Sequence, residues 1–295
     1  MMDAFIAYLQ LEKQCAANTV KAYSNDVNAF KAYLEHAQVT LEVHEVDYDH
    51  IRAWVISLVE EGVSNRTVNR KIAALRSYYR FLQNIGEIEK NPLAKHRALK
   101  TEKKVQIPFS KNEMETVLEE IEYTADFSGL RDKLLIELLY ATGIRRAELI
   151  GICLSDINVA GQTLKVHGKR NKERIVPLIP AVIQTLEAYL NLRGQAKNTQ
   201  DIPYLLLTDS GHKLYETFVY RTINKYLSKA SVKLKKSPHM MRHTFATHLL
   251  DMGADLNAVK ELLGHASLAS TQVYTHSSIA QLKKVHAAAH PRNKE

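Results

Sequence analysis

Long apolar runs and cysteines are scarce in this sequence of 295 residues. No apolar run reaches the roughly 18 to 20 residues that a membrane span needs. The two cysteines, Cys15 and Cys153, are too few for a disulfide framework or a four-ligand zinc site. The first residues, MMDAFIAYLQLEKQ, lack the basic region and apolar core of a signal peptide. These absences exclude a secreted disulfide scaffold and an integral membrane protein, and we expect a protein of the reducing cytoplasm with no membrane partner.

An excess of acidic residues is also absent, because the chain carries 40 Lys and Arg against 32 Asp and Glu. Residues 1–100 hold 13 basic and 12 acidic residues, so most of the net charge of +8 lies in the remainder. Yet the stretch from Gly62 to Gly86 contains no acidic residue and five basic ones, Arg66, Arg70, Lys71, Arg76 and Arg80. Such a stretch is typical of a surface that contacts a polyanion, although a solvated basic face explains it equally well when it is taken alone.

The first hundred residues have the apolar periodicity of amphipathic helices. Within 18–34 and again within 64–82, apolar side chains recur three and four residues apart, which predicts one buried face on each helix. Asn18 and Ser64 are the expected N-caps. Tyr78 and Tyr79 are more typical of the core than of a binding surface.

A polar, basic segment separates this helical part from the rest of the chain. Asn91 precedes Pro92 and so disfavours further helix. The following residues contain few large apolar side chains before Ile107, which predicts an interdomain linker at 99–107.

The second part combines helices with one β signal. Ser110 and Glu113 have the spacing of a capping box, and the apolar helix at 130–142 is expected to end at Gly143. The β-branched runs 163–166 and 174–178 flank a polar turn centred on Gly168, which predicts a hairpin. Helical patterns follow, so the expected fold class is mainly α with two domains.

The segment SPHMMRHTFATHLL contains three histidines and an arginine. His239 and His243 stand four residues apart, as do the zinc ligands of HExxH, but Met240 occupies the place of the glutamate that acts as base. The sequence therefore gives no support for a metalloprotease. His243 and His248 are expected to pack or to support neighbouring groups.

Five short motifs occur in order along the second part: TGIR at 142–145, HGKRNKER at 167–174, HMMR at 239–242, LLGH at 262–265 and QVYTH at 272–276. Together they closely resemble the catalytic set of the tyrosine recombinases, the phage-integrase-like enzymes. TVKAY, LRSYYRFL and the HPR near the end also look like the Xer branch of that family. The resemblance covers essentially the whole chain. It implies a helical, SAM-like core-binding domain at 1–98 and a mostly helical catalytic domain at 108–295.

The resemblance also implies which residues act on DNA. The implied catalytic residues are the nucleophile Tyr274, the general acid Lys169 and four phosphate-binding or proton-transferring groups, Arg145, His239, Arg242 and His265. No metal or other cofactor is implied. The DNA-binding residues expected from the basic stretches are Arg66, Arg70, Lys71, Arg76, Arg170 and Lys172.

The chemistry explains why these residue types are needed. Cleavage of a phosphodiester without a metal requires protein groups to stabilise a pentacoordinate phosphorus, and planar guanidinium groups donate paired charge-assisted hydrogen bonds to phosphate oxygens. Tyrosine has an ordinary pKa of about 10, so as a nucleophile it must lose its proton to a base or in a strongly positive site. The leaving 5′ oxygen must gain a proton.

Taken singly, each residue has a simpler explanation. Arg145 could form a surface ion pair with Glu148, Lys169 could be an ordinary turn lysine, and Tyr274 could be a partly buried aromatic residue. Two departures from the family pattern also exist: Arg170 stands where glycine is common, and Arg146 directly follows Arg145. All the simpler explanations would have to coincide at the family's order and spacing.

The implied function is site-specific strand exchange through a 3′-phosphotyrosyl bond and a Holliday junction. The implied partners are double-stranded DNA with a near-palindromic core site, three further protomers of the same or a related recombinase, and as a candidate a septal DNA translocase. Xer-type resolution of chromosome or plasmid dimers is the favoured role. The alternatives are a mobile-element integrase or invertase, a type IB topoisomerase, and an architectural DNA-binding protein without catalysis.

Overall fold

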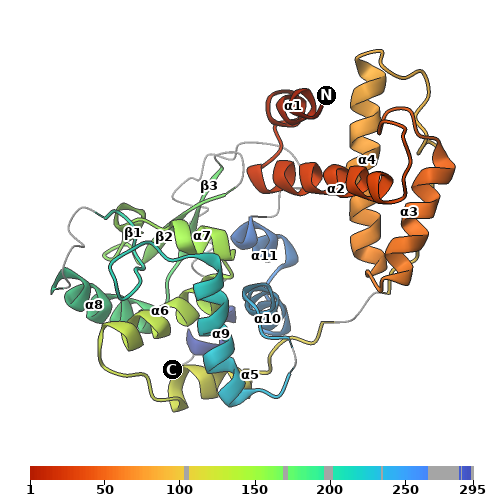
Figure 1. The fold of residues 1–295 in the computed structure, drawn as a ribbon. Helices are drawn as coiled ribbons and strands as arrows, with labels where there is room; N and C mark the ends of the chain where they lie inside the picture. The colour runs from red at the N-terminus through yellow and green to blue at the C-terminus, as the bar shows by residue number, and fades with distance from the viewer. Residues whose placement is uncertain are drawn as a thin grey trace. The chain divides into compact units, whose positions relative to one another are not determined.

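The computed structural model describes residues 1–102, 106–168, 172–195, 202–233, 235–264, 286 and 288–293 (Figure 1). The chain forms two compact units, residues 1–105 and 106–295, and each unit has its own hydrophobic core. Helices dominate both units, and a three-stranded sheet lies in the second, so the expected mainly α fold is confirmed. None of the helices in the described ranges is long and apolar enough to cross a membrane.

The first unit consists of helices that bury one face each. Its helices are α1 (Met2–Ala7), a π-helical turn (Tyr8–Glu12), α2 (Ala17–His36), α3 (Tyr48–Glu60) and α4 (Asn65–Asn84). Ser64 caps α4 by accepting from the Thr67 amide, as expected. The prediction for α2 is wrong, because its N-cap is Ala16, which forms no side-chain cap, and Asn18 lies inside the first turn. Tyr78 and Tyr79 belong to the core, as predicted.

The chain stays attached to α4 after that helix has ended. Asn69 exchanges two hydrogen bonds of 2.8 and 2.9 Å with the Leu99 backbone, and Asn65 donates to the Lys100 carbonyl at 2.8 Å. Backbone groups as far as Lys100 are therefore bound to the first unit. The assignment of residues 1–98 to core binding and of residues 108–295 to catalysis stays a prediction.

The second unit is built around α6 (Phe127–Thr142), which is buried along nearly its whole length. Helices α8 (Pro180–Gln195), α9 (Glu216–Ala230) and α10 (Pro238–Asp251) pack against it (Figure 1). The capping box of Ser110 and Glu113 is present and opens α5 (Lys111–Glu115), which continues as a π-helical turn (Thr116–Glu120). Further short helices in the described residues are α7 (Arg146–Gly151) and α11 (Leu256–Leu263), together with 3-10 turns at Leu154–Asp156 and Pro291–Asn293.

The predicted hairpin is confirmed and gains a third strand. Strands β1 (Ile157–Asn158), β2 (Thr163–His167) and β3 (Glu173–Pro177) form an antiparallel sheet in that order. Val166 pairs with Arg174, and Leu164 pairs with Val176. Alternate residues of a strand share a face, so Arg174 points to the same buried side as Val176.

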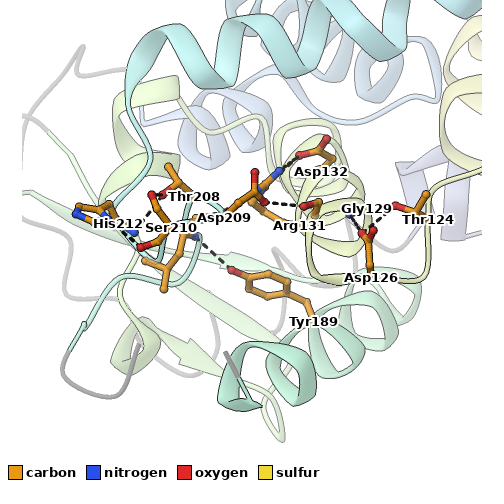
Figure 2. A network of polar contacts seen from close by, with 12 residues as sticks. Thr124, Asp126, Gly129, Arg131, Asp132, Tyr189, Thr208, Asp209, Ser210 and His212 are labelled. Carbon is orange, nitrogen blue, oxygen red and sulfur yellow. Dashed lines mark hydrogen bonds and ion pairs between the residues drawn. The ribbon is translucent and has the colours of Figure 1, made fainter. Parts of the chain in front are cut away.

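A polar network fixes the start of α6 (Figure 2). Asp126 caps the helix by accepting from the Gly129 amide at 2.7 Å. Arg131 donates to Asp132 at 2.9 Å and to Asp209 at 2.6 Å, and its guanidinium lies 4.6 Å from the Phe218 ring centre. The network ties the irregular segment around Asp209 to the central helix.

Candidate active site

The TGIR motif forms a tight turn between α6 and α7. Gly143 ends α6 in the left-handed region, with φ of 60°, as predicted. A Cβ atom at this position would lie 2.2 Å from Cδ1 of Phe245, so the packing also requires glycine. The turn buries Ile144 and places Arg145 as the N-cap of α7, half-exposed. It therefore sets the direction in which the Arg145 side chain leaves the backbone.

Helix α10 supplies two of the predicted residues. Ser237 caps the helix and Pro238 occupies its first turn, where a missing amide costs nothing. His239 follows and is exposed, whereas Arg242, one turn later, is buried. The Arg242 guanidinium donates to the Gly143 carbonyl at 2.7 Å and to the Leu263 carbonyl at 2.5 Å.

The end of α11 brings three arginines together. The carbonyls of Leu262, Leu263 and Gly264 accept from Arg174, Arg242 and Arg145, at 2.9, 2.5 and 3.4 Å. The last carbonyls of a helix have no partner within it and carry a partial negative charge, which favours cations. Gly264, with φ of 63°, ends the helix in the left-handed region and exposes this row of acceptors.

Glu148 is the carboxylate of the cluster. Its Oε1 accepts from Nη1 of Arg145 at 2.7 Å and from Nη1 of Arg174 at 3.1 Å. Its Oε2 accepts from Nη2 of Arg174 and from the Arg145 amide, both at 2.8 Å. Burial raises the pKa of this carboxyl, but the hydrogen bonds from Arg174 and Arg145 outweigh burial and leave the pKa lowered. The ion pair with Glu148 that was the simpler explanation for Arg145 thus exists, but its carboxylate is buried and does not lie at the surface.

The cluster carries three guanidinium groups and one carboxylate. Burial first, and the charges of Arg145 and Arg174 next, lower the pKa of Arg242 to about 10, so it remains charged at neutral pH. Carbonyl dipoles satisfy donors without cancelling their charge. The arrangement therefore keeps an excess of positive charge on fixed side chains, which suits an anion such as a phosphodiester.

The structure brings part of the predicted site together. Arg145 and Arg242 meet at the end of α11, and His239 lies one turn before Arg242 on α10. Lys169, Arg170, His265 and Tyr274 lie outside the described residues. The residues that precede two of them are described: the Gly264 carbonyl accepts from Arg145 at 3.4 Å, and a Cβ atom on Gly168 would lie 3.9 Å from Oε1 of Glu148. The chain thus reaches the cluster at both places.

The predicted DNA-binding residues lie in different surroundings. Arg66 and Lys172 are exposed. Arg70 forms an ion pair with the buried carboxylate of Asp26, and Lys71 lies 3.5 Å from the same carboxylate. Arg76 donates to the His96 carbonyl at 3.0 Å. Their role in DNA binding stays a prediction.

The two supporting histidines behave as expected. His248 is buried between the Tyr140 hydroxyl and the Phe109 carbonyl, each 2.9 Å from a ring nitrogen, and burial lowers its pKa. His243 lies 3.1 Å from the Gln106 carbonyl.

Sequence reasoning gave no role to Arg174. The available signal is the strand alternation, because a residue two places before the inward-facing Val176 must also face inward. A charged residue at such a position requires a buried partner.

Two family profiles match the chain. The profile described as "Phage integrase, N-terminal SAM-like domain" matches residues 2–86, and the profile "Phage integrase family" matches residues 108–281. "Tyrosine recombinase XerC" of Oceanobacillus iheyensis is 40% identical over 295 residues, which cover 99% of this chain and 96% of that protein. "Tyrosine recombinase XerD" of Staphylococcus haemolyticus is 35% identical over 293 residues, covering 99% of both chains.

Solved structures share the fold. XerH bound to palindromic difH in a post-cleavage complex has a TM-score of 0.72 at 22% identity, with coverage of 97% of this chain and 84% of that chain. The Tn1549 transposon integrase with circular intermediate DNA has a TM-score of 0.68 at 21% identity, with coverage of 95% and 98%.

Proposed function

This chain belongs to the phage integrase family of tyrosine recombinases, and we propose that it cuts and rejoins DNA at one near-palindromic site to resolve chromosome or plasmid dimers. The observation that carries the proposal is the junction of Arg145 and Arg242 with adjacent carbonyls at the end of α11. Two residues far apart in sequence are held there as a pair. Their guanidinium groups are the charges that a phosphodiester requires during cleavage.

In the proposed reaction, Tyr274 gives its proton to a base, for which His239 is the candidate, its oxygen attacks the scissile phosphorus, and the bond to the 5′ oxygen breaks. Arg145 and Arg242 hold the phosphate oxygens, His239 and His265 assist, and Lys169 gives a proton to the leaving oxygen. The 3′-phosphotyrosyl bond conserves the energy of the broken bond. A 5′ hydroxyl of another strand then loses its proton and attacks the same phosphorus, while the bond to Tyr274 breaks and the tyrosine oxygen regains a proton. Exchange therefore proceeds through a Holliday junction without ATP.

DNA binding is proposed to rest mainly on phosphate contacts from both units. The second unit contributes the positive cluster, and exposed Lys172 adds a cation immediately before β3, the strand that carries Arg174. The first unit contributes Arg66 and its neighbours on α4. Such binding weakens steeply as salt rises, because released counterions drive it.

The role in dimer resolution is supported by relatives named XerC and XerD that match almost the full length. A tyrosine recombinase of a mobile element would use the same chemistry, and the likeness to the Tn1549 integrase keeps that alternative in view. The identity of the DNA site distinguishes the two roles. A site near the replication terminus supports dimer resolution, whereas a site at the end of a mobile element supports integration.

Covalent capture tests the reaction and the site together. The protein is incubated with nicked fragments of the host genome and denatured, and DNA that stays attached is sequenced. We expect adducts at 3′ ends that converge on one near-palindromic sequence. Tyr274→Phe should form none, whereas Tyr220→Phe, which alters an exposed tyrosine on α9, should react normally.

Absence of adducts with the native protein, in buffer and in cell extract, would support an architectural protein instead. Persistence of adducts in Tyr274→Phe would refute the assignment of the nucleophile. Relaxation of any supercoiled plasmid, with or without the captured site and without strand exchange, would identify a topoisomerase.

Assembly into a homotetramer, or a heterotetramer with a related recombinase, is part of the proposal, with a septal DNA translocase as the candidate activator. The sequence predicts a helix at 277–290, and we propose that it docks onto a neighbouring protomer through its first part, residues 277–285, which lie outside the described residues. The adjacent His286 lies 2.7 Å from the Ala141 carbonyl and Arg292 pairs with Glu137, so deleting the whole tail would also disturb α6. Replacing Leu282 and Val285 by serine is the sharper test. It should abolish pairing of two DNA sites and spare binding to one, and unchanged pairing would contradict the proposal.

A further inference from the structure

Arg174 is a buried arginine on β3 that uses its guanidinium entirely within the protein. Its Nη1 and Nη2 donate to the two oxygens of Glu148, and its Nε donates to the Leu262 carbonyl at 2.9 Å. Only 5% of the residue is exposed. Each of its three nitrogens therefore already donates to a protein partner.

The contacts of Arg174 connect three separate parts of the site. Through Glu148 it reaches the start of α7, where Arg145 lies. Through Leu262 it reaches the end of α11, and a Cβ atom on Gly264 would lie 3.1 Å from its Nη1. A Cβ atom on Gly168, at the neck of the hairpin, would lie 4.0 Å from the same nitrogen.

We propose that Arg174 is a positioning residue for DNA cleavage, which fixes the Arg145 guanidinium and the end of α11 relative to the hairpin. The proposal rests on the proposed function. It assigns a role to a residue outside the implied catalytic set. It predicts that fast formation of the covalent adduct requires the planar guanidinium of Arg174, and that a positive charge alone at this position is not sufficient.

The physical reason is the shape of the guanidinium. A planar fork holds both oxygens of Glu148 while the third nitrogen holds a carbonyl, whereas a lysine ammonium on a flexible stem cannot maintain all three directions. Without that restraint the carboxylate can turn, and Arg145 turns with it. A displacement of about 1 Å in a positioning group can slow a reaction about 100-fold.

The first test compares Arg174→Lys with a matched control, Arg193→Lys. Arg193 is equally buried in the same unit and also donates to carbonyls, those of Ile202, Tyr204 and Leu205, which lie away from the cluster. The rate of covalent adduct formation is measured on the captured DNA site at saturating protein, at a temperature well below each variant's unfolding midpoint. Affinity for the same DNA is measured separately.

We expect Arg174→Lys to slow adduct formation about 10- to 100-fold while the dissociation constant changes by less than about threefold. Arg193→Lys should lower the unfolding midpoint and leave the rate unchanged. A native rate in Arg174→Lys would overturn the proposal. Equal slowing in both variants would also overturn it, because a general loss of rigidity would then be sufficient.

A second readout separates this proposal from the proposed function. The Arg145 amide donates to Oε2 of Glu148, so its hydrogen exchange reports whether the carboxylate is held. Exchange should become about tenfold faster in Arg174→Lys and stay unchanged in Arg193→Lys. If the native protein forms no adduct on any DNA, the proposed function fails. Unchanged exchange at Arg145 would then independently refute the positioning role.

Discussion

In the part of the second unit that the structure describes, the cluster around Arg131 and the cluster at the candidate active site differ in what balances the charge of their arginines. Around Arg131, one guanidinium meets two carboxylates, those of Asp132 and Asp209, and lies against aromatic rings (Figure 2). At the candidate active site there are three guanidiniums and one carboxylate, that of Glu148. Arg145 and Arg174 pair with this carboxylate, and all three guanidiniums donate to carbonyls.

An arginine paired with carboxylates has its charge neutralised and serves the structure, whereas an arginine bonded to carbonyls keeps its charge and can bind an anion. A carboxylate neutralises its partner, so the Arg131 cluster gains nothing by binding another anion. A carbonyl satisfies a donor but leaves its positive charge in place. The cost of burying like charges is visible in the lowered pKa of Arg242, and a bound phosphate would relieve it.

The largest contrast should come from replacing one arginine of each cluster by lysine. Arg242→Lys should slow covalent adduct formation about 10²- to 10³-fold, because it removes directed donors from the transition state. Arg131→Lys should leave the rate of the folded protein unchanged and lower its unfolding temperature instead. Adduct kinetics and calorimetry are measured on the same preparations. Equal slowing in the two variants would break the distinction between the clusters.

The next contrast comes from one glycine beside each cluster. Gly143→Ala should destabilise the unit by about 2 to 4 kcal/mol, because it combines left-handed strain with overpacking against Phe245. It should also slow cleavage, because the Gly143 carbonyl positions Arg242. Gly129→Ala brings a Cβ atom to 2.0 Å from the Thr124 carbonyl, so it should destabilise without slowing cleavage.

A control isolates the strain at Gly143. Gly253 also has a positive φ, of 86°, but a Cβ atom there meets nothing within 4 Å. Gly253→Ala should therefore cost only about 1 kcal/mol. A similar cost for Gly253→Ala and Gly143→Ala, measured by calorimetry, would show that the Phe245 contact relaxes freely.

Acid should act on the two clusters unequally. The pKa of Glu148 is lowered, because hydrogen bonds from Arg174 and Arg145 outweigh the effect of burial. Its contribution to stability is therefore present above its ordinary value of 4.5 and is lost as pH falls through the folded-state value. The pKa of Asp209 is lowered in the same sense, with burial outweighed by Ser128 and Arg131, but this side chain is 66% exposed.

The measurement is the unfolding temperature between about pH 3 and pH 7. Glu148→Gln should lower stability at neutral pH by about 2 kcal/mol and flatten the acid side of the curve. Asp209→Asn should change the stability at neutral pH and the acid side of the curve much less, because solvent screens the ion pair of the exposed Asp209 with Arg131. A larger effect from Asp209→Asn would reverse the ranking of the clusters.

Local signals in the sequence predicted much of this architecture. Ser64, the Ser110 capping box, Gly143 and the hairpin around Gly168 were identified because each depends on neighbouring residues only. Asn18 failed as a cap because the helix starts earlier, at Ala17, and tertiary packing sets such limits. The pairing of Arg145 with Arg242 was implied by resemblance, and the ion pair of Arg145 with Glu148 was named only as a simpler explanation for Arg145. The contacts of Arg174 with Glu148 and Leu262 were not foreseen, because they depend on long-range packing, and strand alternation signals only that Arg174 faces inward.

The smallest effect should come from removing one neutral donor of the Arg131 cluster. The Tyr226 hydroxyl donates to Asp132 at 3.2 Å, and its ring stacks on Tyr123 with centres 4.5 Å apart. Tyr226→Phe keeps the stacking and removes only the hydroxyl, so stability should fall by about 1 kcal/mol and cleavage should not change. The loss stays small because Asp132 still accepts from Arg131. A loss as large as that of Gly143→Ala would mean that Arg131 and Lys225, which lies 3.7 Å from the same carboxylate, do not satisfy Asp132. The cluster would then depend on neutral donors, as the active-site cluster depends on neutral acceptors.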